Sequence, residues 1–217
     1  MKTECNSLWK KKPQARVSIV ITSFNYAKYI EQAIVSCSEQ GDHVELICVD
    51  DCSSDTSVSI IQKNMHRIGI PVLLVKHTRN SGLPKARNSG MRFVRSEFIF
   101  TLDADNVILP YALPKLIKLA KTNDSVAVYG KLRKVDENLT PLGGHLSNCP
   151  PLLGSIINKN KIDERTDKID SNNSRKPHRK IAAKTKGFCH WSEQNRHNLD
   201  EQISPRLGLS NGAAEKI

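Results

Sequence analysis

The segment EFIFTLDADNVILP, residues 97–110, decides the class of fold that we predict for this chain. Its first half is nearly continuous in apolar residues, which is typical of a strand buried on both faces of a parallel sheet. Asp103 and Asp105 follow this strand directly. Their hard oxygen ligands suit Mn²⁺ or Mg²⁺, but either side chain could equally cap a helix that begins near Pro110. The acidic pair alone does not decide between these two roles.

The same alternation of short apolar runs and helix-length amphipathic segments extends over residues 16–130. Strands are expected at 17–22, 44–50, 71–77, 97–103 and 125–130, and helices at 26–40, 54–68, 83–95 and 110–122. Strands that are separated by helices form parallel sheets with right-handed crossovers. The pattern therefore predicts an α/β fold: an open, Rossmann-like, mostly parallel sheet with helices on both faces.

Side chains able to bind a ligand gather near the carboxyl ends of four of these strands. They are Thr22, Phe24, Asp50, Asp51, Arg87, Asp103 and Asp105. In an open parallel sheet, ligands bind in the crevice beyond the carboxyl ends of the strands. We therefore expect these residues to surround one binding site at that edge of the sheet.

Most of these side chains also have a purely structural alternative. One of Asp50 and Asp51 could face a ligand while the other caps the next helix, or both could be caps. Phe24 could stack on a nucleobase or pack against the sheet. For Arg87, neutralising a diphosphate is favoured over a solvated helix face, whereas for Lys85 the solvated face is favoured.

Several classes of protein are excluded because their motifs are missing. No G-x-G-x-x-G follows the first strand and there is no P-loop, which argues against a dinucleotide-dependent dehydrogenase and a P-loop NTPase. The six cysteines include no C-x-x-C pair, so we expect reduced structural thiols. No apolar run reaches a membrane span, and the N-terminus has no secretory signal. These features predict a cytoplasmic protein, with peripheral association at a membrane surface left open.

Composition divides the chain into three parts. Residues 1–15 are expected to form a basic extension, residues 16–145 the α/β domain, and residues 146–217 an irregular, poorly ordered and basic tail, because they hold too few apolar residues to offset the entropy of ordering. A hairpin is expected within residues 131–146. The net charge is +11, but the basic stretch 159–186 has no aromatic residue to stack on bases. Nucleic acid is therefore not expected as a partner.

The strand-end motifs resemble the family 2 glycosyltransferases, which have the GT-A fold. The resemblance rests on VSIVITSFNYAKYIEQAIVS (17–36), ELICVDDCSSDTS (45–57) and NSGLPKARNSGMRFVRSEFIFTLDADNVILP (80–110), and it covers roughly residues 16–140. It implies a nucleotide-sugar donor, usually a UDP-sugar, and a divalent cation, Mn²⁺ or Mg²⁺. It also implies inverting transfer to a hydroxyl of a saccharide, lipid or protein acceptor.

The resemblance further implies a role for each residue of the predicted site. Thr22 and Phe24, with Asp50 or Asp51, would hold the nucleoside. Arg87 would lie near the diphosphate. Asp103 and Asp105 would be the metal-binding D-x-D pair, with Asp105 nearest the cation and Asp103 closer to the ribose or the donor sugar.

The downstream half of the sequence departs from the family. The acidic residue that usually serves as general base, within an aromatic-rich acceptor segment, has no clear counterpart. Only CHWSEQNRHNLDEQ (189–202) offers weak candidates, which are Glu193, Asp200 and Glu201. Two hypotheses follow: a metal-dependent, inverting glycosyltransferase, or a non-catalytic or truncated nucleotide-sugar-binding module that lacks the general base.

Overall fold

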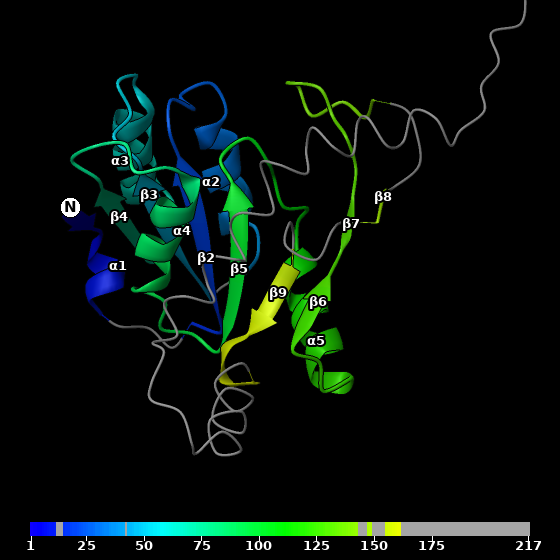
Figure 1. Ribbon diagram of the computed structural model, residues 1–217. Helices are drawn as coiled ribbons and strands as arrows, with labels where there is room; N and C mark the ends of the chain where they lie inside the picture. The colour runs from blue at the N-terminus through cyan, green and yellow to red at the C-terminus, as the bar shows by residue number, and fades with distance from the viewer. Residues whose placement is uncertain (12–14, 42, 143–146, 149–154, 162–217) are drawn as a thin grey trace, which may run out of the picture. The chain divides into compact units, whose positions relative to one another are not determined.

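The computed structural model describes residues 1–11, 15–41, 43–142, 147–148 and 155–161 (Figure 1). The chain divides into two units, Met1–Arg175 and Lys176–Ile217. The second unit lies wholly outside the described residues. The fold below is therefore that of the first unit.

Four parallel strands form the centre of a seven-stranded sheet in this unit. They are β2 (Val17–Ser23), β3 (Val44–Asp50), β4 (Val72–Lys76) and β5 (Phe98–Asp103), in the spatial order β4-β3-β2-β5. Every residue of β2 and β3 is buried, as their continuous apolar runs predict. The prediction of an open, mostly parallel α/β sheet is confirmed.

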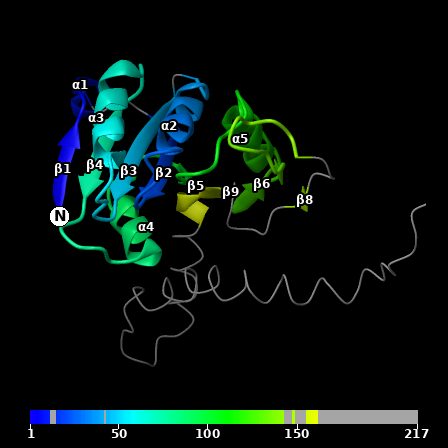
Figure 2. The same ribbon diagram turned by 90° about the horizontal axis from the view of Figure 1, so that it is seen from above.

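Helices cover both faces of this sheet (Figure 2). On one face α2 (Ile30–Ser38), α3 (Ser57–Arg67) and α5 (Ala112–Thr122) contribute to the larger hydrophobic cluster. On the other face α4 (Leu83–Met91) packs over β2 and β3 in a smaller cluster. All four helices coincide with predicted ones, although each is shorter than its amphipathic segment.

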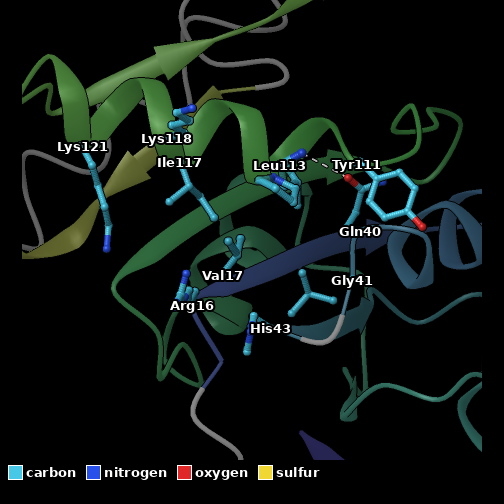
Figure 3. A pocket seen from close by; sticks show the side chains of 12 residues that line it. Arg16, Val17, Gln40, Gly41, His43, Tyr111, Leu113, Ile117, Lys118 and Lys121 are labelled. Atoms are coloured by element: carbon cyan, nitrogen blue, oxygen red, sulfur yellow. Dashed lines mark hydrogen bonds between the residues drawn. The ribbon is translucent and has the colours of Figure 1, made fainter.

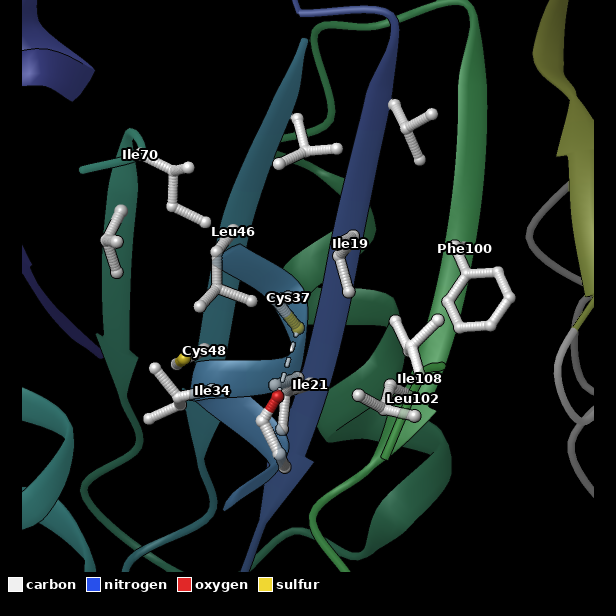
Figure 4. Close-up of a cluster of buried hydrophobic side chains, with 14 of the residues drawn as sticks. Ile19, Ile21, Ile34, Cys37, Leu46, Cys48, Ile70, Phe100, Leu102 and Ile108 are labelled. Atoms are coloured by element: carbon white, nitrogen blue, oxygen red, sulfur yellow. Dashed lines mark hydrogen bonds between the residues drawn. The ribbon is translucent and has the colours of Figure 1, made fainter. Parts of the chain in front are cut away.

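The larger cluster is a close-packed core of aliphatic side chains with two buried thiols (Figure 4). Ile19, Ile21 and Leu46 are fully buried in it, beside Cys37 and Cys48. Burial raises the pKa of Cys48 to about 12 and holds that of Cys37 well above its ordinary value. Both thiols are free and protonated at neutral pH, so they are structural, as expected.

The N-terminal residues belong to the sheet rather than to an extension. Strand β1 (Lys2–Cys5) pairs antiparallel with β4, and the short helix α1 (Ser7–Lys10) follows. Between them lies Asn6, whose buried amide donates to the carbonyls of Met65 and Ile70 and whose oxygen accepts from the amide of Val72. One buried side chain thus ties the segment to the sheet, which composition could not reveal.

The opposite edge of the sheet also uses residues beyond the expected boundary at 145. Strand β9 (Ser155–Asn158) lies between β5 and β6 (Ala127–Tyr129) and is antiparallel to both. Ile156 is fully buried there. The part of residues 146–217 that the structure describes is therefore not irregular throughout, because β9 completes this side of the sheet.

The region where a hairpin is expected follows β6 and Gly130, and it has a turn at residues 137–138. Strands β7 (Lys131–Leu132) and β8 (Ser147–Asn148) pair antiparallel in a separate two-stranded sheet. Val135 and Pro141 form an isolated antiparallel bridge within the connection. In the described part of the chain, no helix has the length and apolar character needed to cross a lipid bilayer.

Candidate functional site

The parallel strands end at the same edge of the sheet, so the loops that follow β2 and β3 meet there (Figure 1). Side chains of one loop bind the backbone of the other. The Asn25 oxygen accepts from the Ser54 amide at 2.9 Å, and Ser53 Oγ accepts from the Asn25 amide at 2.9 Å. Asp55 accepts from the amide of Ala27 at 3.0 Å. These reciprocal bonds make the two loops one wall of the site.

Asp50 is buried at the end of β3 and turns back into its own loop. Its carboxylate accepts hydrogen bonds from the amide of Ser53 at 3.0 Å and from the Ser53 hydroxyl. Only 2% of the residue is exposed. The local turn therefore uses this carboxylate, but Asp50 does not cap α3, which begins at Ser57 and has no side-chain cap.

Asp51 is also buried, and it holds the loop that follows β4. Its carboxylate accepts from Nδ1 of His77 at 2.6 Å, from the amide of Ser81 at 2.9 Å and from the amide of Gly82 at 2.7 Å. Gly82 has φ +83°, which a residue with a side chain rarely adopts. Asp51 thus fixes the turn that leads into α4.

The acidic pair after β5 lies beside an arginine of α4. A terminal nitrogen of Arg87 donates to Oδ1 of Asp103 at 2.9 Å, and the two side chains are only 17% and 20% exposed. Asp105 is exposed and makes no hydrogen bond or ion pair with the described residues. The structure therefore brings Arg87 and the D-x-D segment together.

Neither aspartate of this pair caps the following helix. Helix α5 begins at Ala112, after Tyr111, and has no side-chain cap at that position. The amide of Leu113 instead donates to Oε1 of Gln40 at 3.1 Å. The capping alternative for Asp103 and Asp105 is therefore wrong.

Two polar residues, one in α2 and one just after its end, anchor the loop that carries Asp105. Ser36 Oγ accepts from the amide of Ile108 at 3.1 Å, and Gln40 Nε2 donates to the carbonyl of Leu109 at 3.0 Å. Both anchoring residues are buried. The sequence analysis did not single them out, although polar residues on the buried side of an amphipathic helix are a usable signal.

The end of β2 presents polar groups that the described residues leave unsatisfied. Thr22 Oγ1 and Ser23 Oγ are buried and have no hydrogen-bond partner there. Phe24, the next residue, is 42% exposed. Buried polar groups without partners are rare and costly in folded proteins, so these two hydroxyls mark a place where a bound molecule would supply the missing partner.

The acidic pair has the donor chemistry for a hard cation but does not form a closed metal site. Within the described residues, no group of three or more His, Cys, Asp or Glu side chains could hold a metal ion. Magnesium-type sites often use one or two carboxylates and complete their shell with substrate phosphates and water. The residues present fit a cation that binds together with a phosphorylated ligand.

A pocket of about 280 Å³ lies away from this edge (Figure 3). It is lined by the residues at and just before the starts of β2 and β3, which include Arg16 and His43, and by one side of α5, which includes Ile117. None of the predicted site residues lines it. The loops at the carboxyl ends of the strands are the stronger candidate for the functional site. The hydroxyls of Thr22 and Ser23 and the carboxylate of Asp105, which lack partners among the described residues, lie there.

The weak candidates for a general base, Glu193, Asp200 and Glu201, lie outside the described residues. The remaining site residues lie around the carboxyl edge of β2, β3 and β5. A doubly wound sheet with an arginine and an acidic pair at this edge is typical of nucleotide-binding α/β proteins.

The family model described as Glycosyl transferase family 2 matches residues 18–190, and the chain belongs to this family. The predicted resemblance is confirmed. An uncharacterized glycosyltransferase of Nostoc sp. is 31% identical over 146 residues, which are 65% of this chain and 45% of that protein. The undecaprenyl-phosphate 4-deoxy-4-formamido-L-arabinose transferase of Edwardsiella ictaluri is 31% identical over 122 residues, 54% of this chain and 37% of that protein.

A solved structure shares the fold. TarS of S. aureus (residues 1–349), crystallised in complex with UDP-GlcNAc, superposes with a TM-score of 0.59 at 20% identity, over 70% of this chain and 47% of that one. The present chain thus spans less than half of each of these three proteins.

Proposed function

We propose that this chain binds a nucleotide-sugar donor, a UDP-sugar, at the carboxyl edge of β2, β3 and β5, and that its protein transfers the sugar to a hydroxyl acceptor with inversion. The observation that carries the proposal is the contact of Arg87 with Asp103 beside the free carboxylate of Asp105. A guanidinium and two carboxylates suit a diphosphate that binds with a dication.

In this proposal Asp105, with Asp103, holds the cation, Mn²⁺ or Mg²⁺. When bound, the cation neutralises the negative charge that develops on the departing nucleoside diphosphate. Arg87 adds a second positive charge in a site where the two paired side chains are largely shielded from water. Its ion pair with Asp103 keeps the guanidinium oriented toward the donor.

The nucleoside portion is assigned to the end of β2. The hydroxyl of Thr22, which has no partner among the residues that the structure describes, can bond to the base or the ribose, and the exposed face of Phe24 offers a stacking surface. Because the described loops already use the carboxylates of Asp50 and Asp51, we assign these two residues to shaping the walls of the nucleoside site.

The acceptor and the general base define the alternative function. If residues 189–202 supply no base, the chain is a nucleotide-sugar-binding module rather than a complete enzyme. The relative from Edwardsiella ictaluri is named for transfer to undecaprenyl phosphate, so a lipid-linked acceptor at a membrane surface is one of the proposed acceptors, beside saccharides and proteins. The proposed location is the cytoplasm.

Isothermal titration with UDP tests the donor site. Wild-type protein should bind UDP in Mn²⁺ and lose most of the affinity in EDTA. The Asp105→Ala variant should bind about tenfold more weakly or worse in Mn²⁺, because it lacks a carboxylate ligand. Glu39→Ala, which removes an exposed carboxylate at the end of α2, is the charge-matched control and should bind normally.

Equal heats with Mn²⁺ and EDTA, or normal affinity in Asp105→Ala, would contradict the metal role. A second assay separates the two functions. Slow release of free sugar from a UDP-sugar without acceptor indicates an enzyme, whereas binding without turnover supports the binding module.

A further inference from the structure

A chain of three side chains links the end of β3 to the last turn of α4. Asp51 Oδ1 lies 2.6 Å from Nδ1 of His77, and Nε2 of His77 lies 2.9 Å from Oγ of Ser89. A carboxylate can only accept, so Nδ1 of His77 carries a hydrogen, while Nε2 shares a hydrogen bond with the Ser89 hydroxyl. His77 is thereby bonded on both sides, and its side chain is only 9% exposed.

The order Asp–His–Ser resembles a nucleophilic triad, but the surrounding amides exclude that role. A serine nucleophile needs backbone N–H groups aimed at the developing oxyanion. The amides next to Ser89 instead lie beyond the first turn of helix α4 and donate to carbonyls of the helix itself. The chain of bonds therefore serves to hold structure in place.

What it holds is the helix that carries Arg87. Asp51 binds the amide of Gly82, which precedes the first residue of α4, while His77 binds Ser89 one half-turn beyond Arg87. Gly90 leaves no room for adjustment, because a Cβ there would lie 2.5 Å from Cγ1 of Val20. The helix is thus fixed at its start by Asp51 and near its end by His77.

We infer that His77 is a positioning residue of the donor site. Through Asp51 and Ser89 it sets the position of α4, so that Arg87 reaches Asp103 and the donor diphosphate. This assignment rests on the proposed function for its effect on affinity. The hydrogen bonds among Asp51, His77 and Ser89 are part of the fold itself and do not depend on the proposed function.

Titration of UDP in Mn²⁺ measures the effect on the site. His77→Ala should weaken UDP binding about tenfold, because two hydrogen bonds that hold α4 are lost. His77→Asn should recover most of the affinity, since its amide places a donor where Nδ1 stood. His66→Ala, an exposed histidine on α3, should bind as the wild type does.

A double-mutant cycle shows whether His77 acts through Arg87. Arg87→Ala should weaken UDP binding, and adding His77→Ala to it should cause little further loss. Additive losses would mean that His77 does not work through the arginine and would overturn the inference. Failure of His77→Asn to recover affinity would also count against it.

Amide hydrogen exchange separates this inference from the proposed function. The Ser81 amide donates only to Asp51 among the described residues, so its exchange reports whether that carboxylate is still held. Exchange should accelerate in His77→Ala and return toward the wild-type rate in His77→Asn, whether or not UDP binds. If the Ser81 amide exchanged as slowly in His77→Ala as in the wild type, the positioning role would be overturned. If the wild-type protein did not bind UDP, only the proposed donor site would be refuted.

Discussion

The two ends of strand β2 differ in how their buried polar groups are hydrogen-bonded. At the amino end Glu45, fully buried, accepts from Ser18 Oγ at 2.5 Å and from two side-chain nitrogens of Arg95 at 2.8 and 2.6 Å. At the carboxyl end the hydroxyls of Thr22 and Ser23 are buried, and no residue in the described part of the chain bonds to them. A buried network in which every polar group is hydrogen-bonded stabilises the fold, and we call the amino end the closed end for this reason. Polar groups that lack a partner can bond to a ligand, and we call the carboxyl end the open end.

The largest loss of stability should follow from breaking the buried hydrogen-bond network around Glu45, at the amino end. Glu45→Ala leaves the guanidinium of Arg95 stacked on Trp9 without its carboxylate. Breaking a buried pair costs about 3–5 kcal/mol, and we expect the low end of this range because Arg95 is 29% exposed. Urea denaturation measures the loss, and UDP affinity of the folded fraction should not change.

An exposed ion pair provides the control for this prediction. Glu31→Ala removes the partner of Arg67 on the surface and should cost no more than about 1 kcal/mol. A loss for Glu45→Ala as small as that of the control would show that the buried network contributes little. Reduced UDP affinity in folded Glu45→Ala would show that the two ends are coupled.

The same contrast explains which parts of the fold could be predicted from sequence. The central strands and their helices could be predicted because each has a local sequence pattern. The apolar runs of β2, β3 and β5 each indicate a buried strand without reference to any other segment. Strand β9 is different, because its four residues include only two isoleucines and it pairs with β5 more than fifty residues away. Strand β1 is equally short. A sequence pattern does not contain such non-local pairings.

The site shows a similar division. The acidic pair, Arg87 and the strand-end positions of Thr22 and Phe24 could be read from order and spacing. The partners of each carboxylate could not, because they come from other loops. The sequence left open how Asp50 and Asp51 are used, and only the contacts of Asp51 with His77, Ser81 and Gly82 show that it holds a loop.

A substitution at the open end should separate stability from binding. Thr22→Val keeps the shape of the side chain and deletes the unpartnered hydroxyl. Relieving a buried unsatisfied group should raise the free energy of unfolding by about 1 kcal/mol, while UDP affinity falls about fivefold through the loss of one hydrogen bond. Denaturation and calorimetry on the same protein measure both changes.

The matched control is on the same strand and the same face, four residues earlier. Ser18→Ala removes a hydroxyl that donates to Glu45, so it should lower stability by about 1–3 kcal/mol and leave UDP binding intact. Loss of stability in Thr22→Val would show that its hydroxyl has a partner after all. Unchanged UDP affinity would remove Thr22 from the nucleoside site.

The smallest predicted effect is a pH dependence of the loop wall at the open end. Burial raises the pKa of Asp55, but hydrogen bonds from Ser57 and Ala27 together outweigh it and hold the pKa below its ordinary value of 3.8. Because the folded pKa is depressed, the stabilisation is present above the unfolded pKa and is lost as the pH falls through the folded one. The wall should therefore loosen below about pH 4.

Thermal unfolding between about pH 5 and about pH 2.5, which brackets the ordinary pKa of 3.8, should show this loss in the wild type and less of it in Asp55→Asn. The comparison with Asp55→Asn is needed because Glu4, whose pKa is lowered by hydrogen bonds from Lys76 and Gln62, loses its contribution over the same range. Glu4 is distant in sequence and lies on β1, so Glu4→Gln should remove its own share without altering exchange of the Ala27 amide. Identical pH profiles for the wild type and Asp55→Asn would mean that the bonds from Ala27 and Ser57 do not depend on the charge of Asp55, and that the wall stays closed in acid.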